Sequence, residues 1–556
     1  MTRLIAAALL AACHLFAGVA LAQGPDAALA ARVDAMFAQH NQAPGPGLAL
    51  AVVRDGQVLL RRGYGLANIE HRVPITPSTV FDVASVSKQF TGLAVAMLVQ
   101  QGRVRMSDDI RTHIPELPDL GRRITVAHLV HHTSGLRDWP GTLAVGGWRF
   151  DDVISFDQIL AMAYHQRDLN FAPGAEHMYS NTGYNLLAEM VQRVTGRPFR
   201  AWTHEQLFAP LGMTATHFRD DHTEVIADRA FGYARMDGGY RHSPNNLTAL
   251  GSSSLFSSVD DLARWMINFD RATVGGRAAM DLMRTKGRLN DGTEISYAFG
   301  IVHGRHRGLP MLTHSGSWAS FRTFLAWLPE QRFGVVVLAN SGSIDVQNAV
   351  IRITDIYLER ELAAAQASAP APATPTAALV PPATPDEITG MYRLGTGWYV
   401  RIRRQGDAFT AQATHEEAVP MTQRSRSEFW VESYRASMLF PADAAGKVTR
   451  LEYRGIRAPK VEDVPRPAGR LDAYAGEYES AELGTAYRVA VRNGALEMHH
   501  RRHGTIPLAW IRGDEFGSTT WFMRSVSFQR DAAGTVTALV VNVDPRSRDI
   551  RFVKRR

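Results

Sequence analysis

The sequence predicts an α+β fold in which an antiparallel sheet is flanked by helices and is followed by two small antiparallel β units. Three observations predict it. Alternating apolar runs lie near both ends of the region 23–362, with helical patterns between them. An Ala- and Pro-rich segment then interrupts the chain at 363–386. Beyond it, the sequence repeats itself at an offset of 88 residues.

Residues 1–22 indicate a secretory signal peptide. Arg3 supplies the positive start, Leu4–Leu21 is apolar, and small residues precede a predicted cleavage after Ala22. The alternative is a lipobox ending at Cys13, whose lipidation would keep the protein at a membrane. The expected location is therefore the periplasm, after secretion across the inner membrane, with a lipoprotein anchored through Cys13 as the alternative.

Composition excludes several classes of function. A chain of 556 residues with 45% hydrophobic content predicts two or three domains. Cys13 is the only cysteine, so a processed chain has no disulfide and no thiolate metal site. The net charge of +7 comes from arginines scattered through the chain, without the basic stripe or tail that nucleic-acid binding requires. We expect no cofactor and no metal.

The first domain, predicted for 23–362, begins and ends with strand patterns. Residues 47–65 form two alternating runs around the Asp55–Gly56 turn, and 321–340 predicts two more strands. Helical patterns fill the interval and include one at Ser85–Gln101, which Gly102 ends. The simplest arrangement is one antiparallel sheet built from both ends of the domain, with helices packed on it.

The linker at 363–386 lacks aromatic residues and cannot bury a core. The two β units then occupy 387–466 and 467–556. Their internal repeat is clearest where DAAGKVTRL from Asp443 returns as DAAGTVTAL from Asp531. Each unit is long enough for a small antiparallel barrel or sandwich.

The strongest chemical signal is Ser85 followed by Lys88 at the start of an almost entirely apolar helix. Residues three apart share a helical face, which puts the lysine amine beside the serine hydroxyl. Burial lowers the pKa of a lysine, so the amine can act as the base that activates the serine. The alternative is a helix cap beside a surface charge, and the SxxK spacing alone does not exclude it.

Two further motifs follow in order. Tyr179 and Asn181 form a YxN triplet before a helix, and His314 and Gly316 form an HxG triplet before a strand. SxxK, YxN and a basic residue followed by x and Gly resemble the three motifs of the penicillin-binding and serine β-lactamase superfamily. The resemblance covers Ala31–Leu362 and implies a β-lactamase-like serine hydrolase domain.

The resemblance implies a role for each matching residue in catalysis. Ser85 would be the acylated nucleophile and Lys88 its base, while Tyr179 would relay a proton to the leaving group. The backbone N–H groups of Ser85 and Ser317 would form an oxyanion hole.

The resemblance also implies substrate-binding roles. Asn181 would bind the substrate amide and fix the Lys88 amine. His314 would lie at the mouth of the site, on the sheet edge, and Gly316 would allow a close approach of substrate and backbone.

His314 stands where the superfamily more often carries lysine. A neutral histidine holds a substrate carboxylate weakly, which argues against a dedicated β-lactamase or DD-carboxypeptidase. D-aminopeptidases of the superfamily combine an HxG motif with two β-barrels, and this chain is similar in both respects. The similarity implies that both C-terminal units are barrels and that a barrel loop carries an acidic residue for the substrate amine. Asp514 and Glu515 are candidates.

Three hypotheses of function stay open. The first is a serine peptidase or amidase acting on short peptides with D-residues, and the second is an esterase on the same scaffold. The third is a penicillin-binding or β-lactamase-like protein that acylates with slow turnover. All three involve a small peptide, amide or ester substrate, and fold resemblance alone does not choose among them.

Other polar pairs are predicted to be structural. His131 and His132 are adjacent and point in different directions, without a third metal ligand at helical spacing. The pair Asp108–Asp109 suits helix capping, and Tyr184–Asn185 suits packing within the helix after the YxN triplet.

Overall fold

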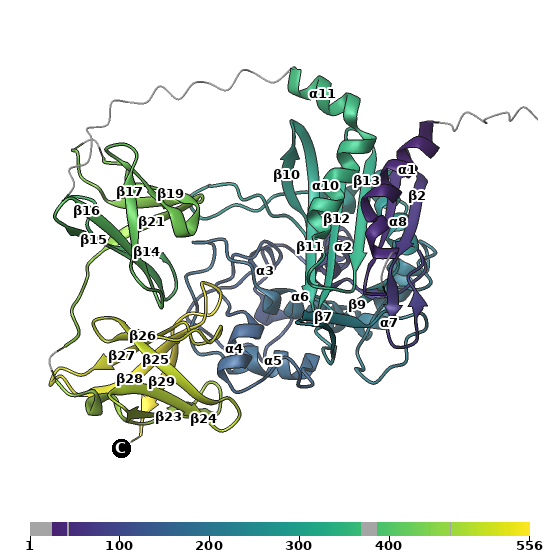
Figure 1. Cartoon of the computed structure of the whole chain (residues 1–556). Coiled ribbons are helices and arrows are strands. Elements are labelled where there is room, and N and C mark those ends of the chain that lie inside the picture. Colours follow the sequence, from purple (N-terminus) through teal and green to yellow (C-terminus); the bar gives the residue numbers. More distant parts are fainter. Residues whose placement is uncertain (1–24, 42–43, 368–385, 444, 468, 556) are drawn as a thin grey trace, which may run out of the picture.

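The computed structural model describes residues 25–41, 44–367, 386–443, 445–467 and 469–555. The predicted signal peptide and Cys13 lie outside these residues. An N-terminal domain, residues 25–367, contains one large sheet with helices on both faces (Figure 1). Two closed β-barrels follow it and lie beside each other. This arrangement confirms the predicted α+β fold with two C-terminal barrels.

The large sheet joins strands from both ends of the N-terminal domain. Its order is β10-β11-β12-β13-β1-β2, and every neighbouring pair is antiparallel. The strand bounds are β1 (Leu48–Arg54), β2 (Gln57–Tyr64), β10 (Val302–His306), β11 (Leu309–Trp318), β12 (Phe321–Leu328) and β13 (Phe333–Ala339). Pairing of β1 with β13 makes the start and end of the domain one unit, as the two hairpin patterns predicted.

Both faces of the sheet are buried because helices cover each of them. Along β1, Leu48, Leu50 and Val52 pack with α1, α10 and α11, whereas Ala49 and Ala51 pack into the core around α2 and α8. The helices are α1 (Pro25–Phe37), α2 (Ser87–Gln100), α3 (Val126–Val130), α4 (Trp139–Val145), α5 (Phe156–His165), α6 (Asn181–Thr195), α7 (Phe199–Thr203), α8 (Val259–Arg271), α9 (Gly276–Met283), α10 (Val346–Tyr357) and α11 (Glu359–Ala367).

Short strands and turns complete the N-terminal domain. The strands are β3 (Leu66–Asn68), β4 (Val73–Pro74), β5 (Phe81–Asp82), β6 (His217–Phe218), β7 (Gly232–Met236), β8 (Gly239–Ser243) and β9 (Leu255–Ser257). One-turn helical segments are η1 (Ala38–Asn41), η2 (Ala84–Val86), η3 (Ile110–Thr112) and η4 (His204–Phe208). The β7–β8 hairpin and the η2 turn border the cavities described below.

Each C-terminal unit closes into an eight-stranded antiparallel barrel, which decides between the barrel and the sandwich. Barrel 1 contains β14 (Gly390–Gly395), β15 (Trp398–Gln405), β16 (Ala408–Ala413), β17 (Val419–Gln423), β18 (Glu428–Val431), η5 (Glu432–Tyr434), β19 (Ala436–Leu439), β20 (Arg450–Tyr453) and β21 (Ile456–Val461). Barrel 2 contains η6 (Leu471–Tyr474), β22 (Gly476–Ser480), β23 (Thr485–Arg492), β24 (Ala495–His500), β25 (Gly504–Arg512), β26 (Glu515–Gly517), β27 (Ser525–Arg530), β28 (Val536–Asn542) and β29 (Ile550–Lys554).

The linker predicted at 363–386 begins inside a helix, because α11 continues to Ala367. Positions 368–385 lie outside the described residues. The domain boundaries themselves stay predictions.

Barrel 2 is anchored to the N-terminal domain by a buried arginine. Arg137 is fully buried and forms an ion pair with Glu482 in the β22–β23 loop of barrel 2. Its guanidinium also donates from Nε to the Arg548 carbonyl at 2.7 Å and from Nη2 to the Asp549 carbonyl at 3.1 Å. A buried guanidinium needs this set of acceptors, so the cation fixes the β28–β29 loop against the domain.

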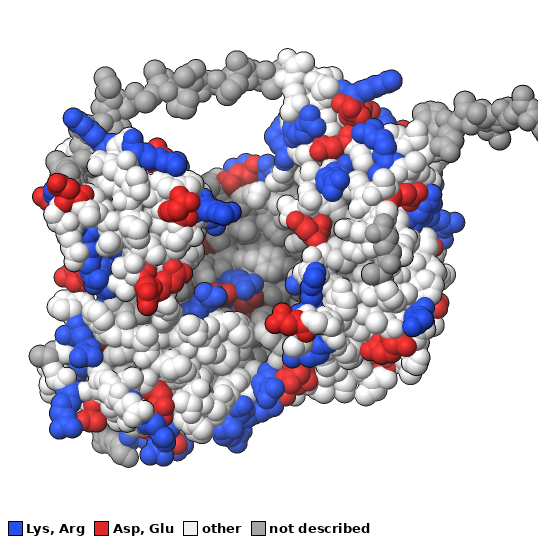
Figure 2. All heavy atoms as spheres, in the orientation of Figure 1, with Lys and Arg blue, Asp and Glu red and all other residues white. Residues whose placement is uncertain are grey.

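Charges of both signs are spread over the face of the molecule drawn in Figure 2, and the surface is hollowed between the barrels and the N-terminal domain. This mixture agrees with the scattered arginines of the sequence. Within the described residues, no helix combines the length and apolar character that crossing a membrane requires.

We predict that Arg137→Met destabilises the protein strongly, because it leaves the Glu482 carboxylate buried without a counter-ion. Breaking one partner of a buried ion pair costs about 3–5 kcal/mol. The free energy of unfolding in urea, followed by tryptophan fluorescence, measures the loss.

The control is Arg555→Met, which removes an exposed ion pair with Glu479 in the same barrel and should change stability little. Equal effects of the two substitutions would contradict the anchoring role of Arg137.

Candidate active site

The Ser85 hydroxyl lies at the start of helix α2. Ser85 occupies the η2 turn, and the α-helix proper begins two residues later at Ser87, so the predicted helix start is refined. Lys88 follows on the first turn, and its Nζ lies 3.2 Å from Ser85 Oγ. The SxxK spacing thus brings the lysine amine and the serine hydroxyl into contact, as predicted.

The Lys88 amine is buried and held by fixed acceptors. Its Nζ donates to Asn181 Oδ1 at 2.8 Å and to the Ser252 carbonyl at 2.7 Å. A neutral amine has two hydrogens, so these two contacts leave its lone pair for Ser85 Oγ. Burial lowers the pKa of Lys88 to about 7, an effect that Asp138 opposes and Arg546 reinforces through their charges. The amine can therefore accept a proton near neutral pH.

Tyr179 and Asn181 lie at the start of α6, against the lysine. The Tyr179 ring centre is 4.8 Å from Lys88 Nζ. Burial raises the pKa of the Tyr179 hydroxyl, although a hydrogen bond with Ser85 opposes the rise. Ser180 caps α6 by accepting from the Gly183 N–H, which orients the first turn of the helix. A protonated tyrosine in contact with Ser85 can carry a proton to a leaving group.

His314 lines the same pocket as Ser85 and is buried there, with only 4% of its surface exposed. Its Nδ1–H donates to the Ser315 carbonyl at 2.8 Å, so Nε2 accepts from the Tyr297 hydroxyl at 3.0 Å. Burial, reinforced by the Lys88 charge, lowers the pKa of His314 to about 3. The third motif therefore presents a neutral group, which agrees with the weak carboxylate capture expected from the sequence.

Gly316 and Ser317 follow on β11. A Cβ at Gly316 would lie 2.3 Å from the Val83 carbonyl oxygen, so the glycine lets β11 approach the backbone that precedes Ser85. The close approach at Gly316 is thus between two backbone segments of the chain itself, whereas the prediction concerned substrate and backbone. Ser317 lines the pocket together with Ser85. Its place in the oxyanion hole stays a prediction.

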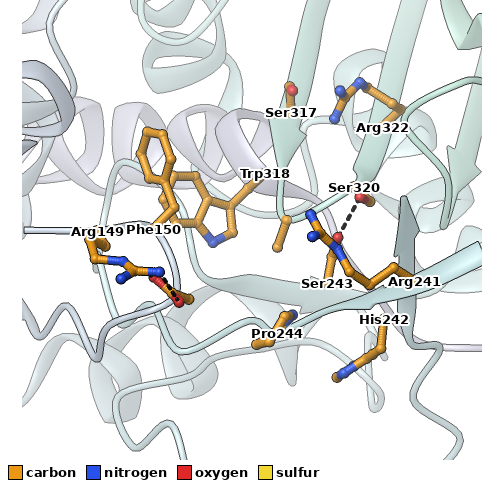
Figure 3. A pocket seen from close by; sticks show the side chains of 12 residues that line it. Arg149, Phe150, Arg241, His242, Ser243, Pro244, Ser317, Trp318, Ser320 and Arg322 are labelled. Carbon is orange, nitrogen blue, oxygen red and sulfur yellow. Dashed lines mark hydrogen bonds and ion pairs between the residues drawn. The ribbon is translucent and has the colours of Figure 1, made fainter. Parts of the chain in front are cut away.

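A pocket of about 520 Å³ lies over these groups. Trp139, Phe150 and Trp318 line one wall, and the Phe150 and Trp318 side chains lie next to each other in Figure 3. Trp521 of barrel 2 stacks on Phe150 with ring centres 4.9 Å apart. The wall is apolar and suits a hydrophobic part of a substrate.

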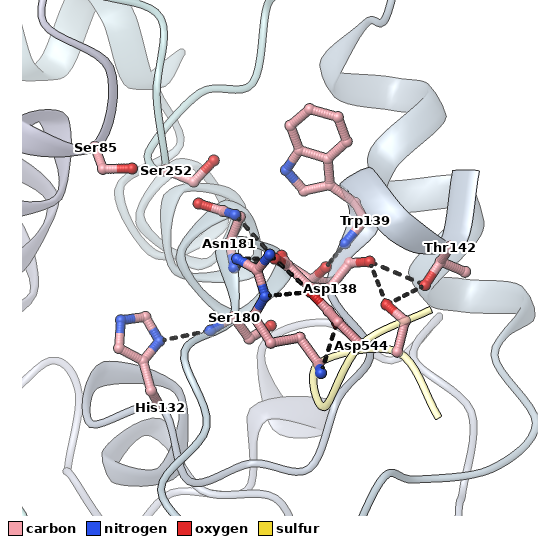
Figure 4. Close-up of polar contacts among 12 residues, drawn as sticks. Ser85, His132, Asp138, Trp139, Thr142, Ser180, Asn181, Ser252 and Asp544 are labelled. Atoms are coloured by element: carbon pink, nitrogen blue, oxygen red, sulfur yellow. Dashed lines mark hydrogen bonds and ion pairs between the residues drawn. The ribbon is translucent and has the colours of Figure 1, made fainter. Parts of the chain in front are cut away.

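Barrel 2 also reaches the pocket through its β28–β29 loop, which carries Arg546. The Arg546 guanidinium lies 3.4 Å from Asp138 Oδ2 and donates to Asp544 Oδ2 at 2.8 Å. Asp138 in turn accepts from the backbone N–H of Asn181 at 2.8 Å and from its side-chain amide at 3.1 Å (Figure 4). A chain of charges and hydrogen bonds therefore connects the barrel loop to the lysine.

Asp138, Ser252 and Arg546 were not predicted from the sequence. Asp138 and Ser252 belong to no recognised motif, and Arg546 lies 461 positions after Ser85 in the sequence, in a loop that only folding brings close. The prediction that Asp514 or Glu515 would bind a substrate amine at the site was wrong. Asp514 pairs with Arg530, and Glu515 accepts from Tyr399 of barrel 1, so both lie at barrel positions outside the pocket.

The remaining polar pairs have structural contacts. His131 contacts the Thr285 carbonyl, whereas His132 accepts from the Ser180 N–H and packs under the Tyr179 ring. Asp109 caps η3, and Asn185 donates to the Leu250 carbonyl. Among the described residues, no group of three or more His, Cys, Asp or Glu side chains is placed to hold a metal ion.

Comparison with known proteins finds relatives of the N-terminal domain. Residues 33–357 match the family model described as Beta-lactamase, which covers more than half of the chain. A D-aminopeptidase from Gluconobacter oxydans (strain 621H) is 30% identical over 320 residues, covering 57% of this chain and 59% of that protein. The alignment therefore spans less than two thirds of that relative.

Solved structures show the same fold. The penicillin-binding protein homologue from Pyrococcus abyssi superimposes with a TM-score of 0.53 at 20% identity, covering 86% of this chain and 99% of that chain. D-amino acid amidase from Ochrobactrum anthropi SV3 has a TM-score of 0.51 at 22% identity, covering 60% of this chain and 98% of that chain. At these identities the likeness concerns the fold alone.

We predict that kcat/KM for p-nitrophenyl acetate falls as pH drops below about 7. Only neutral Lys88 can take the Ser85 proton, and lowering the pH through its pKa of about 7 protonates the amine. A profile of kcat/KM from pH 5 to 9 measures this decrease, the acidic limb of the profile. A rate independent of pH between 6 and 8 would contradict the role of Lys88 as the base.

Lys88→Arg should lower the rate at least about a hundredfold across this range, because a guanidinium stays protonated. Lys286→Arg, a substitution in an ion pair with Glu294 away from the pocket, serves as the matched control.

We predict that Arg546→Met moves the same limb to higher pH. The guanidinium repels a proton on Lys88, so its removal raises the pKa of the lysine. Arg548→Met is the control, because Arg548 lies in the same loop and pairs with Glu176 instead. The pH profiles of kcat/KM for both variants test this prediction. An acidic limb at the wild-type pH in Arg546→Met would argue against an electrostatic effect of the barrel loop on Lys88.

Proposed function

The chain belongs to the beta-lactamase family of serine hydrolases, and from that premise we propose that it forms an acyl-enzyme on Ser85 and cleaves short amides or peptides with D-residues. One observation carries the proposal: the Lys88 amine lies 3.2 Å from Ser85 Oγ, is buried, and has a pKa lowered to about 7. A serine hydroxyl needs such a base before it can attack an acyl carbon.

In the first step, neutral Lys88 takes the proton of Ser85 as Oγ bonds to the substrate carbonyl carbon. The carbonyl oxygen becomes an oxyanion, which we assign to the backbone N–H groups of Ser85 and Ser317. The two contacts of Lys88 Nζ with Asn181 Oδ1 and the Ser252 carbonyl support this direction of transfer, because both acceptors also stabilise the ammonium that forms.

Collapse of the tetrahedral intermediate breaks the bond to the leaving amine. The amine needs a proton, which Tyr179 can donate because its hydroxyl forms a hydrogen bond with Ser85 at the reacting centre. The Lys88 ammonium, which packs against the tyrosine ring, then returns a proton to the phenolate. A water molecule then attacks the acyl carbon and gives one proton to Lys88. The ester bond to Ser85 Oγ breaks, Oγ takes that proton from Lys88, and the acid product leaves. Hydrolysis thus consumes one water and leaves the enzyme unchanged.

The proposed substrate class has separate support. A D-aminopeptidase is one of the relatives at about 30% identity, which makes an amide with a D-residue the first class to test. The apolar wall of Trp139, Phe150 and Trp318 suits a short hydrophobic side chain. The same wall also suits a small ester, whose better leaving group needs less assistance, so an esterase is the second candidate.

The location of the enzyme is a proposal that rests on the sequence alone. Arg3, the apolar run Leu4–Leu21 and the small residues before Ala22 support secretion to the periplasm. Lipidation of Cys13 would tether the same domain to a membrane instead.

The test compares N-acetyl-D-alanine 4-nitroanilide, its L-counterpart and p-nitrophenyl acetate. We expect the D-anilide to be cleaved at least about tenfold faster than the L-anilide, by kcat/KM. Ser85→Ala should lower all rates at least about a thousandfold. Intact-mass spectrometry of the rapidly quenched enzyme should detect an acyl adduct in the wild type.

Ser78→Ala is the matched control, because Ser78 is exposed and does not line the pocket. Cleavage of the ester alone would replace the amidase by the esterase. Turnover that survives in Ser85→Ala would overturn the proposed nucleophile.

A further inference from the structure

A small cavity of about 120 Å³ lies beside the β7–β8 hairpin, and the catalytic steps above do not use it. Its described lining includes three basic side chains, His222, Arg229 and His242, and no Asp or Glu. The volume is about a quarter of the 520 Å³ of the catalytic pocket. The cavity is therefore too small for a peptide and suits a compact anion.

Arg229 is half-buried and forms no ion pair within the described parts of the chain. Its guanidinium lies over the Phe231 ring, 5.3 Å from the ring centre, and burial lowers its pKa. The acids of the preceding segment, Asp220 and Glu224, are engaged by Arg200 instead. A cation that has lost part of its hydration without gaining a counter-ion favours an anionic ligand.

His242 approaches the same aromatic ring from β8. The His242 and Phe231 ring centres are 5.4 Å apart, so the Phe231 ring brings His242 and Arg229 together at the cavity. A histidine donates at least one N–H in either protonation state, which lets both side chains donate to one anion. The Glu70 carboxylate interacts with the charge of His242, but it accepts a hydrogen bond from Tyr233 and does not line the cavity.

A second arginine lies behind the cavity wall. Arg219 is fully buried, and its Nε and Nη1 have no hydrogen-bond partner among the described residues. Its guanidinium lies 4.8 Å from the Phe256 ring centre and donates from Nη2 to Asn245 Oδ1 at 3.2 Å, and both of these residues line the cavity. Asp82 opposes the charge of Arg219 most strongly among the acids, yet its carboxylate accepts from Asn245. The guanidinium therefore adds positive potential behind the wall.

Asn245 also connects this wall with the turn that carries the nucleophile. Its Oδ1 accepts from Trp318 Nε1 at 3.2 Å, and its Nδ2 donates to Asp82 Oδ2 at 2.7 Å. The other Asp82 oxygen accepts from the Ala84 N–H at 2.7 Å, directly before Ser85. An anion bound against Asn245 would thus touch a residue that supports the catalytic pocket.

A larger cavity of about 710 Å³ lies between the small cavity and the catalytic pocket. It shares Phe150, Ser317 and Trp318 with the catalytic pocket, and it shares part of the hairpin with the small cavity. Arg241 and Arg322 line only the larger one. In Figure 3 the side chains of Arg241 and the adjacent His242 extend to different sides of the hairpin, so the cations of the two cavities are separate.

We propose that the small cavity binds a free tetrahedral oxyanion, such as inorganic phosphate or sulfate, between Arg229 and His242 and in front of the buried Arg219. This ligand is not a substrate of Ser85, so the site goes beyond the proposed function and does not depend on it. A planar guanidinium can donate to two oxygens of such an anion at once. The bound anion would neutralise Arg229 and stabilise the hairpin wall.

Calorimetric titration of the full chain with sodium phosphate, at an ionic strength fixed with sodium chloride, tests the site. We expect saturable one-to-one binding to the wild type. Arg229→Met and His242→Phe should each weaken it at least about tenfold, because each removes a donor to the anion. Glycerol 3-phosphate carries the same group on a bulkier body and should bind more weakly, whereas tighter binding would overturn the free oxyanion as the ligand.

Two control variants should keep the wild-type affinity for phosphate. Arg235→Met removes an exposed arginine of the same hairpin that lines a different cavity, and Arg322→Met removes a cation of the larger cavity. Absence of binding to the wild type would overturn the proposal. So would an affinity that is lost in Arg322→Met and kept in Arg229→Met, because the anion would then occupy the larger cavity.

Thermal melting gives a second measurement that does not need enzyme activity. A ligand that binds the native state raises Tm, so phosphate should raise Tm of the wild type more than sodium chloride does at equal ionic strength. Arg229→Met should fold in phosphate-free buffer and lose this rise. If it does not fold, His242→Phe decides, because His242 is exposed and its loss leaves the core intact. A rise as large as that of the wild type in His242→Phe would refute the site.

Discussion

The site depends on one constraint, a lysine amine kept away from water at the first turn of a buried helix. Lys88 is fully buried because α2 is apolar on nearly every side and packs inside the N-terminal core. An ammonium there loses hydration, so the pKa of the amine falls to about 7. Asn181 and the Ser252 carbonyl then direct the lone pair toward Ser85. The packing that stabilises the domain is therefore also what lowers the pKa of this amine.

Barrel 2 belongs to this site as much as the N-terminal domain does. Its β28–β29 loop is fixed by the buried guanidinium of Arg137, and the same loop delivers Arg546 to Asp138. Because Asp138 holds Asn181, and Asn181 accepts from Lys88, the barrel acts on the base through a continuous series of contacts. The charges oppose one another at the lysine: Asp138 favours its ammonium, and Arg546 disfavours it. Docking of the barrel thus affects electrostatics as well as the shape of the pocket.

The charges at the catalytic cleft differ from those that the domain layout predicted. The layout resembles that of D-aminopeptidases, which led to Asp514 and Glu515 as candidates for binding a substrate amine. Those side chains pair within and between the barrels, with Arg530 and Tyr399. Arginines occupy the catalytic cleft and its neighbouring cavity instead, at Arg546, Arg322 and Arg241. Proteins that share this fold can therefore differ in the charges that line the catalytic cleft.

The sequence by itself determined the antiparallel sheet built from both ends of the domain, the two repeated β units, and the contact of Lys88 with Ser85. Each of these follows from local periodicity or from spacing within one helix, which the chain carries in short segments. Tertiary structure alone decided the burial of His314, the close approach of Gly316 to Val83, and the meeting of Asp138 with Arg546. Those features join segments as much as 408 positions apart (Asp138 to Arg546), and side-chain burial and charge depend on neighbours that no local pattern records.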